Sequence, residues 1–271
     1  MKKVDACEVI GIIHKTVKPV DVVNAEVDGM LVYGHRGAGG EAPENTIAGS
    51  QHAIARGARY LELDMRLSKD GGLVMIHDDT VDRTTESKGK INTYTVAELK
   101  KMDARQDGAP WPNKRNTGVV TLDAMLDATP EIKGYQLEVK TGSTEQMEQV
   151  AELLVERFPT ESSIDRIVVT SSSSTLLQRL MAVAPHIPRG YISIGPNPFP
   201  VLDRFKCSLL AMNWSVCNII NLGHARRKGL HVSVWTVNDS SVIKNLHRSK
   251  VDSVITDYPS MALPLIASLD R

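Results

Sequence analysis

Eight short apolar segments along the chain have the length and composition of buried β-strands, and most are followed by a segment with the pattern of a helix. The helix pattern is clearest in residues 144–158, where apolar side chains form one stripe. Strands that alternate with helices predict a parallel sheet, and eight such units within 271 residues predict an α/β fold made of a single (β/α)8 barrel. The predicted strands cover residues 30–34, 59–66, 135–139, 166–171, 189–194, 208–213, 230–236 and 252–256.

One long region interrupts this repeat. Residues 78–134 exceed the length of a simple connection, so we place an insertion at 78–120, after a hairpin that follows the second strand. The insertion contains a capping box that begins at Thr95, and an irregular loop at 103–118. We expect this loop to lie over the site and to select the substrate. Trp111 in the loop either lines the entrance or packs as an anchor.

Residues 1–29 precede the first predicted strand and form an N-terminal extension to the barrel at 30–271. The β-branched residues of the extension predict ordered packing, either against the amino-terminal face of the barrel or against another subunit. Its positively charged start resembles that of a signal peptide, but Asp5 and Glu8 interrupt the short apolar run that follows. We therefore expect a cytoplasmic protein.

The overall composition excludes several classes of partner. Lysine and arginine together number 32, as do aspartate and glutamate, so no global field favours nucleic acid or an anionic membrane surface. No apolar run is long enough to predict a membrane span. The three cysteines, Cys7, Cys207 and Cys217, have no CxxC spacing and are expected to be reduced thiols. The oligomeric state is left open.

The reactive residues gather in the first third of the chain. Glu62 and Asp64 alternate with apolar residues along a predicted strand, so both carboxylates point to one side. The turn after this strand is too short for a parallel crossover, so residues 73–77 return as a hairpin and bring His77 about opposite Asp64. His35 and Arg36 follow the first strand, at the end where barrels keep their sites. These groups predict a metal-assisted site that acts on an anion.

Several short motifs resemble those of the glycerophosphodiester phosphodiesterase family, and they occur in the family's order from residue 31 to the C-terminus. The resemblance implies a TIM barrel with metal-dependent hydrolase activity. The chain departs from the family pattern at Ser172, where a phenylalanine is usual, and at Val120, where a proline is usual. The motifs are GHRG (34–37), PENT (43–46), ELDM (62–65), HDDTVDRTT (77–85), EVK (138–140), WTVN (235–238) and TDYP (256–259).

The resemblance also implies roles for individual residues. It makes His35 and His77 the acid/base pair, which we assign as base and acid respectively, and it makes Arg36 and Lys140 the phosphate contacts. The implied metal ligands are Glu62, Asp64 and Glu138. Three converging carboxylates repel one another unless a cation joins them, and oxygen ligands without any soft donor predict one Ca²⁺ or Mg²⁺ ion.

The expected reaction is hydrolysis of a small-molecule glycerophosphodiester to glycerol 3-phosphate and an alcohol. Trp235, at a strand end, either forms an apolar wall for the alcohol or packs in the core. One alternative is a lysophospholipase D type of activity on a lipid-bearing diester, and another is a non-catalytic barrel that binds phosphoesters. The mainly polar insertion favours a water-soluble head group, and the two histidines favour catalysis.

Overall fold

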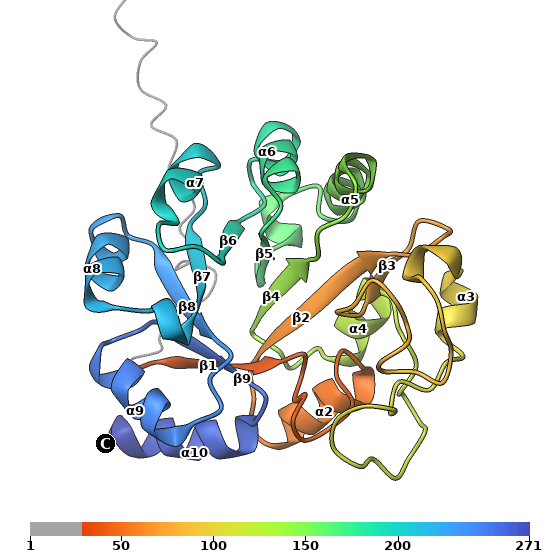
Figure 1. Ribbon diagram of the computed structural model, residues 1–271, viewed down its shortest axis with the longest axis horizontal. Helices are drawn as coiled ribbons and strands as arrows, with labels where there is room; N and C mark the ends of the chain where they lie inside the picture. The colour runs from red at the N-terminus through yellow and green to blue at the C-terminus, as the bar shows by residue number, and fades with distance from the viewer. Residues whose placement is uncertain (1–28) are drawn as a thin grey trace, which may run out of the picture.

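The computed structural model describes residues 29–271, so the expectations for the N-terminal extension lie outside the described residues apart from its last position. In this part of the chain strands and helices alternate (Figure 1). The strands are β1 (Leu31–His35), β2 (Tyr60–Leu67), β3 (Leu73–Met75), β4 (Gly134–Val139), β5 (Ile167–Ser171), β6 (Arg189–Ser193), β7 (Leu209–Asn213), β8 (His231–Trp235) and β9 (Ser253–Thr256). The helices are α2 (Ile47–Ala55), α3 (Val96–Leu99), α4 (Leu122–Ala128), α5 (Thr144–Arg157), α6 (Ser174–Val183), α7 (Phe199–Arg204), α8 (Ile219–Arg227), α9 (Ser240–Arg248) and α10 (Pro259–Leu269).

The strands form one sheet whose two ends meet. Within the described residues the parallel strands follow the order β1-β9-β8-β7-β6-β5-β4-β2, and β1 also pairs with β2. This closed ring confirms the predicted (β/α)8 barrel, and each predicted barrel strand is shifted by no more than one residue at either end. Because the strands are parallel, their carboxyl ends meet at one face of the barrel.

The predicted hairpin is present, but its register differs by one residue from the expectation. β3 pairs antiparallel with β2, with Met75 opposite Met65. The strand ends at Met75, and the next residue, Ile76, donates its backbone N–H to the carbonyl of Asp64 (3.0 Å). Ile76 rather than His77 is therefore opposite Asp64, and His77 lies one residue further along.

The sequence predicts Asn45 as the cap of the helix after the first strand and Asn238 as the cap of the helix at 239–249, and both caps are wrong by one residue. The side chain that accepts a backbone N–H at the start of α2 is Thr46 rather than Asn45, and at the start of α9 it is Asp239 rather than Asn238. Asparagine, threonine and aspartate are all good caps, so sequence preference alone does not separate neighbours. In both cases the displaced asparagine instead bonds an aspartate on or directly after the neighbouring strand, as described below.

Helix α8 begins later than predicted. The sequence pattern predicts a helix over residues 215–228 with Ile219 and Ile220 directed inward. In the structure Asn218 accepts the N–H groups of residues 220 and 221, so α8 starts at Ile219, after a separate turn of 3₁₀ helix at 214–216. Ile219 and Ile220 are 83% and 76% exposed, which contradicts the prediction that they pack in the core.

The insertion packs against the hairpin with a small apolar cluster of its own. The predicted capping box at Thr95 is present and starts α3. The loop at 103–118 turns toward α2, where the Trp111 ring meets His52 edge-on with 5.5 Å between centroids. Of the two alternatives for Trp111, this contact supports the packing anchor rather than the lining of the entrance. The buried members of the cluster are Val74, Ile76, Val81, Ile91, Leu99, Met102 and Val119.

The main core lies between the sheet and the surrounding helices, and smaller clusters fill the inside of the barrel. Cys207 and Cys217 are free thiols. Among residues 29–271 no helix combines the length and the apolar character needed to cross a bilayer. The expected cytoplasmic location stays a prediction.

Candidate active site

A pocket of about 260 Å³ opens at the carboxyl ends of the strands. One side is polar and carries the groups from β1, β2 and β4, and the other is apolar and comes from β6, β7, β8 and β9. The polar side contains His35, Arg36, Glu62, His77, Glu138 and Lys140. The apolar side contains Ile192, Ile194, Ala211, Trp235 and Ile255. In the described chain the 103–118 loop contributes no residue to the lining of this pocket, although its Asp107 accepts from Arg83 Nη1 (2.7 Å), and its expected role in substrate selection stays a prediction.

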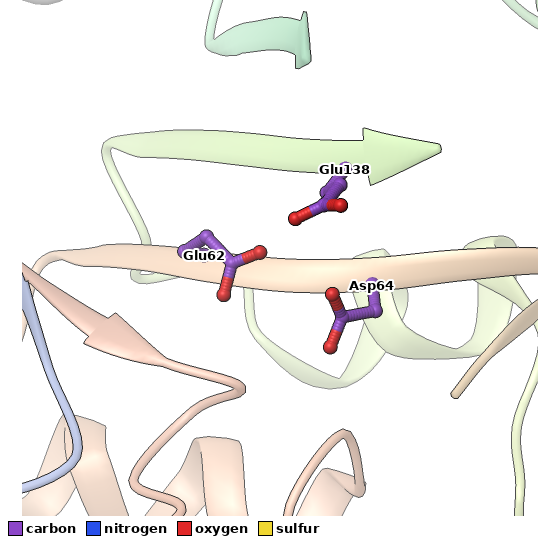
Figure 2. Close-up of side chains that lie close together, drawn as sticks. All are labelled: Glu62, Asp64 and Glu138. Atoms are coloured by element: carbon purple, nitrogen blue, oxygen red, sulfur yellow. The ribbon is translucent and has the colours of Figure 1, made fainter. Parts of the chain in front are cut away.

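Three carboxylates converge at the polar side, as Figure 2 shows. Glu62 and Asp64 are two residues apart on β2 and so share one face of the strand. Glu138 is the direct neighbour of Asp64 on the adjacent parallel strand β4. One oxygen from each of the three lies within 4.8 Å of the others, and Glu62 and Asp64 are buried.

Nearby cations neutralise the three carboxylates of this triad to different extents. Lys140 Nζ lies 2.9 Å from Asp64 Oδ1 and 2.6 Å from Glu138 Oε1. Burial alone would raise the pKa of Asp64, but Lys140 and Arg36 outweigh it and hold that pKa below its ordinary value. Burial and the charge of Asp64 raise the pKa of Glu62 to about 8. The triad can therefore accept more positive charge, and its oxygen donors fit a hard divalent cation such as Mg²⁺ or Ca²⁺.

Asn45 holds Asp64 in place from the other side. Its Nδ2 donates to Asp64 Oδ2 (2.8 Å), and its Oδ1 accepts the backbone N–H of Asp64 (3.0 Å). Asn45 has a φ of 55°, in the left-handed region that asparagine tolerates better than most residues. These two bonds explain why Asn45 does not cap α2.

His35 is held by a carboxylate from the far end of the chain. Its Nδ1 lies 2.6 Å from Asp257 Oδ1, and Asp257 Oδ2 in turn accepts from Asn238 Nδ2 (2.6 Å). The other ring nitrogen, Nε2, lies 3.8 Å from Glu62 Oε2. Burial opposes a charge on His35, but the bond to Asp257 and the charge of Glu62 outweigh it, so the pKa of His35 is raised.

His77 also has a carboxylate partner on Nδ1, but its pKa is shifted in the opposite direction from that of His35. Its Nδ1 lies 2.6 Å from Asp78 Oδ1, and Arg83 Nε donates to Asp78 Oδ2 (2.8 Å). Burial lowers the pKa of His77, and the cations Arg36 and Lys140 add to this effect against the opposing influence of Asp64 and Asp78.

Arg36 reaches the pocket from the loop after β1. Its Nη1 donates to both oxygens of Glu44 (3.0 and 3.1 Å), and its Nε lies 3.3 Å from Asp64 Oδ2. Glu44 also accepts from two nitrogens of Arg83, each at 2.8 Å. The orientation of the Arg36 guanidinium is thus fixed by carboxylates behind it.

Comparison with known proteins identifies the family. The model of the glycerophosphoryl diester phosphodiesterase family matches residues 35–261, a range that contains every site residue named above. This chain belongs to that family. Membership confirms the resemblance seen in the motifs and the predicted class of enzyme, a phosphoric diester hydrolase.

Relatives match along almost their whole length. A glycerophosphodiester phosphodiesterase of Caldanaerobacter subterraneus subsp. tengcongensis is 30% identical, and the match covers 87% of this chain and 97% of the relative. The Bacillus subtilis protein YhdW is 35% identical over 86% of this chain and 97% of its own. The solved structure of an Oleispira antarctica phosphodiesterase in complex with the product sn-glycerol-3-phosphate is 28% identical, with a TM-score of 0.75 and coverage of 88% and 97%.

All the site residues predicted from the sequence gather around this one pocket of the phosphodiesterase barrel, with Asp64 in the carboxylate triad behind its lining. Sequence reasoning did not find the residues that hold them in place. Those residues lie inside the family motifs, which were therefore the signal that could have found them. They are Glu44, Asn45, Asp78, Arg83 and, as the partner of His35, Asp257.

Proposed function

We propose that this family member hydrolyses glycerophosphodiesters to glycerol 3-phosphate and an alcohol, with one divalent cation and two histidines. The observation that carries the proposal is the arrangement of two histidine rings, each with a carboxylate on Nδ1, beside one triad of converging carboxylates. Orientation of a ring by a bond at one nitrogen leaves the other free for proton transfer. The product bound to the Oleispira antarctica relative supports this choice of substrate.

Each polar group has a place in the proposed reaction. Glu62, Asp64 and Glu138 hold the cation, which supplies Lewis acidity to a phosphoryl oxygen when bound. Arg36 and Lys140 bind the remaining phosphate oxygens. With a divalent ion present, these groups leave about one net positive charge, which matches a singly charged phosphodiester.

The contacts favour His35 as the acid and His77 as the base, which is the reverse of the expected order. His35 lies between the carboxylates of Asp257 and Glu62, and both stabilise a proton on the ring. Burial lowers the pKa of His77, and the charges of Arg36 and Lys140 lower it further, so a proton on this ring is disfavoured. We therefore propose that His35 donates a proton to the leaving alcohol and His77 removes one from the nucleophile.

The nucleophile in this proposal is the hydroxyl of the substrate next to the phosphate. That hydroxyl is already held near the phosphorus, and such proximity contributes up to about 7 to 11 kcal/mol to lowering a barrier. Its attack breaks the bond to the alcohol and leaves a cyclic phosphodiester, which water then opens to glycerol 3-phosphate.

The activity is tested with a panel of glycerophosphodiesters, with and without chelator. Chelator-sensitive release of glycerol 3-phosphate is the expected result. Binding of the diesters without turnover in the presence of Mg²⁺ or Ca²⁺ would instead support the non-catalytic barrel.

The order of the two histidines is tested with a leaving group that needs no proton. His35→Ala should cost on the order of 10² to 10⁴ in rate on an alkyl ester and much less on a p-nitrophenyl ester. His77→Ala should cost about the same on both esters. The opposite pattern would restore His77 as the acid.

A further inference from the structure

A second cleft, of about 440 Å³, lies between helix α2 and the 103–118 loop of the insertion (Figure 1). It shares no lining residue with the active-site pocket. Its volume falls within the range of about 300 to 1,000 Å³ that is typical of small-molecule sites. We call it the α2 cleft, and its polar and aromatic lining consists of Gln51, His52, Trp111, Asn113, Arg115 and Asn116.

The lining of the α2 cleft contains one permanent positive charge and no carboxylate. That charge is the guanidinium of Arg115, which is exposed. Two other cations of the same loop are paired with Asp103 instead: Lys114 Nζ lies 3.6 Å from Asp103 Oδ2, and Arg105 Nε donates to Asp103 Oδ1 (2.7 Å). A guanidinium in a cleft without acidic groups favours an anion, and its planar fork suits the oxygens of a phosphate.

The other lining residues fit a ligand rich in hydroxyl groups. Gln51, Asn113 and Asn116 each contribute a side-chain amide, which both donates and accepts hydrogen bonds as a hydroxyl does. The half-buried indole of Trp111 adds an apolar surface, and its edge-on contact with His52 holds it in place. One phosphate contact, several amides and one aromatic surface together match a small phosphorylated sugar or polyol.

The loop that forms one wall of the α2 cleft is connected to the catalytic groups through Arg83. Asp107 of this loop accepts from Arg83 Nη1 (2.7 Å). The same guanidinium binds Glu44 (2.8 Å), the carboxylate that orients the proposed phosphate contact, and Asp78 (2.8 Å), the carboxylate beside the proposed base. A shift of the loop would therefore alter the contacts that hold both of these catalytic groups.

We propose that the α2 cleft is a regulatory site for a small phosphorylated sugar or polyol, and that a ligand there activates hydrolysis by holding the 103–118 loop against Arg83. A ligand that contacts both α2 and the loop stabilises the arrangement in which they are close, and in that arrangement Asp107 reaches Arg83. The backbone bond from the Ala48 N–H to the Asn116 carbonyl (3.0 Å) joins the two walls in the same arrangement. The effect on rate rests on the proposed function, whereas the binding site does not depend on it.

The first test measures binding by calorimetry, with ribose 5-phosphate and glucose 6-phosphate as probes and with chelator present so that no metal contributes. Wild-type protein should bind at least one of the two, and Arg115→Gln should weaken this binding about tenfold or more, because the charged contact is lost. Lys114→Gln is the matched control, since this neighbouring cation faces Asp103 and lines neither the cleft nor the active-site pocket. Equal affinities for wild type and Arg115→Gln, or no binding of either probe, would overturn the proposal.

The second test measures KM for sn-glycero-3-phosphocholine with and without a saturating amount of the probe that binds. KM should fall about fivefold in wild type and in Lys114→Gln, and should not change in Arg115→Gln. Asp107→Asn weakens the contact with Arg83, so this variant should bind the probe as wild type does but lose the effect on KM. A probe that raises KM as a competitor would lie in the active-site pocket, and this result would overturn the proposal.

The two tests separate this inference from the proposed function. If no glycerophosphodiester is hydrolysed but the probe binds in a way that depends on Arg115, the proposed function fails and the α2 cleft remains a binding site. If hydrolysis proceeds and the bound probe leaves KM unchanged, the regulatory role fails and the proposed function stands.

Discussion

Asp257 Oδ1 lies 2.6 Å from His35 Nδ1, although the two residues are 222 positions apart in the chain. Asp257→Asn keeps the shape of this side chain and removes its charge. The charge of Asp257 raises the pKa of His35, so its loss should move the titration of His35 to lower pH. We expect kcat to fall on the order of 10- to 100-fold, less than for loss of the ring itself.

The measurement is the pH dependence of kcat for wild type and variant. Asp270→Asn is a matched control, because Asp270 makes the same kind of contact with His247 (2.7 Å) outside the pocket. An unchanged pH profile in Asp257→Asn, with a lowered thermal stability alone, would make Asp257 purely structural.

The second prediction concerns the metal. Chelation should abolish activity, and Mg²⁺ or Ca²⁺ should restore it, because the three converging carboxylates are the proposed ligands of one cation. Glu62→Gln, Asp64→Asn and Glu138→Gln should each weaken metal binding in calorimetry. Full activity in excess chelator would show that the triad has another role.

Metal binding should also depend on pH. Without a cation the pKa of Glu62 is raised to about 8, so this carboxyl is mostly protonated at neutral pH and must lose its proton to bind. Metal affinity should therefore rise with pH up to about 8 and then level off. Titration in buffers of different ionisation enthalpy measures the released proton, and Glu62→Gln should remove most of that release.

The fourth prediction concerns the phosphate contact of Arg36. Arg36→Lys keeps the charge but loses the planar group that Glu44 orients, so KM for the diester should rise and kcat/KM fall by about tenfold or more. Arg105→Lys is the control, since Arg105 makes an equally paired contact with Asp103 in the insertion. Kinetics equal to wild type for Arg36→Lys would limit Arg36 to a structural role.

The fifth prediction concerns the cyclic intermediate. A substrate with hydrogen in place of the hydroxyl next to the phosphate should react slower by about 10³ or more, since it lacks the internal nucleophile. An analogue that lacks the terminal hydroxyl instead should react at a rate close to normal. Comparable rates for the first analogue and the natural substrate would establish direct attack by water.

The strands were predictable because each one is a short apolar run with its own turn signals, so local pattern and final structure agree. Helix starts were less predictable. Asn45 and Thr46 are both good cap residues, and the choice between them depends on a bond from Asn45 to Asp64 in a different strand. A rule that considers only neighbouring residues in the sequence cannot predict that bond.

Ile219 and Ile220 show a second limit of local reasoning. An apolar pair in a helix normally faces the core, and the sequence led to that expectation. The cap at Asn218 instead starts α8 directly before this pair, so its first turn is exposed at the barrel mouth. The partners of the two histidines were missed for a similar reason, because a carboxylate that orients a ring leaves no periodic signal.

β1 pairs with β2 on one side and with β9 on the other, and these two pairings close the ring of strands. Since Asp257 directly follows β9, a chain still under synthesis contains the three carboxylates of the triad long before it contains the partner of His35. The last strand must leave the ribosome and enter the gap beside β1 before that pair exists. We therefore expect full hydrolytic activity only after β9 has closed the ring, and its appearance during translation would mark that step.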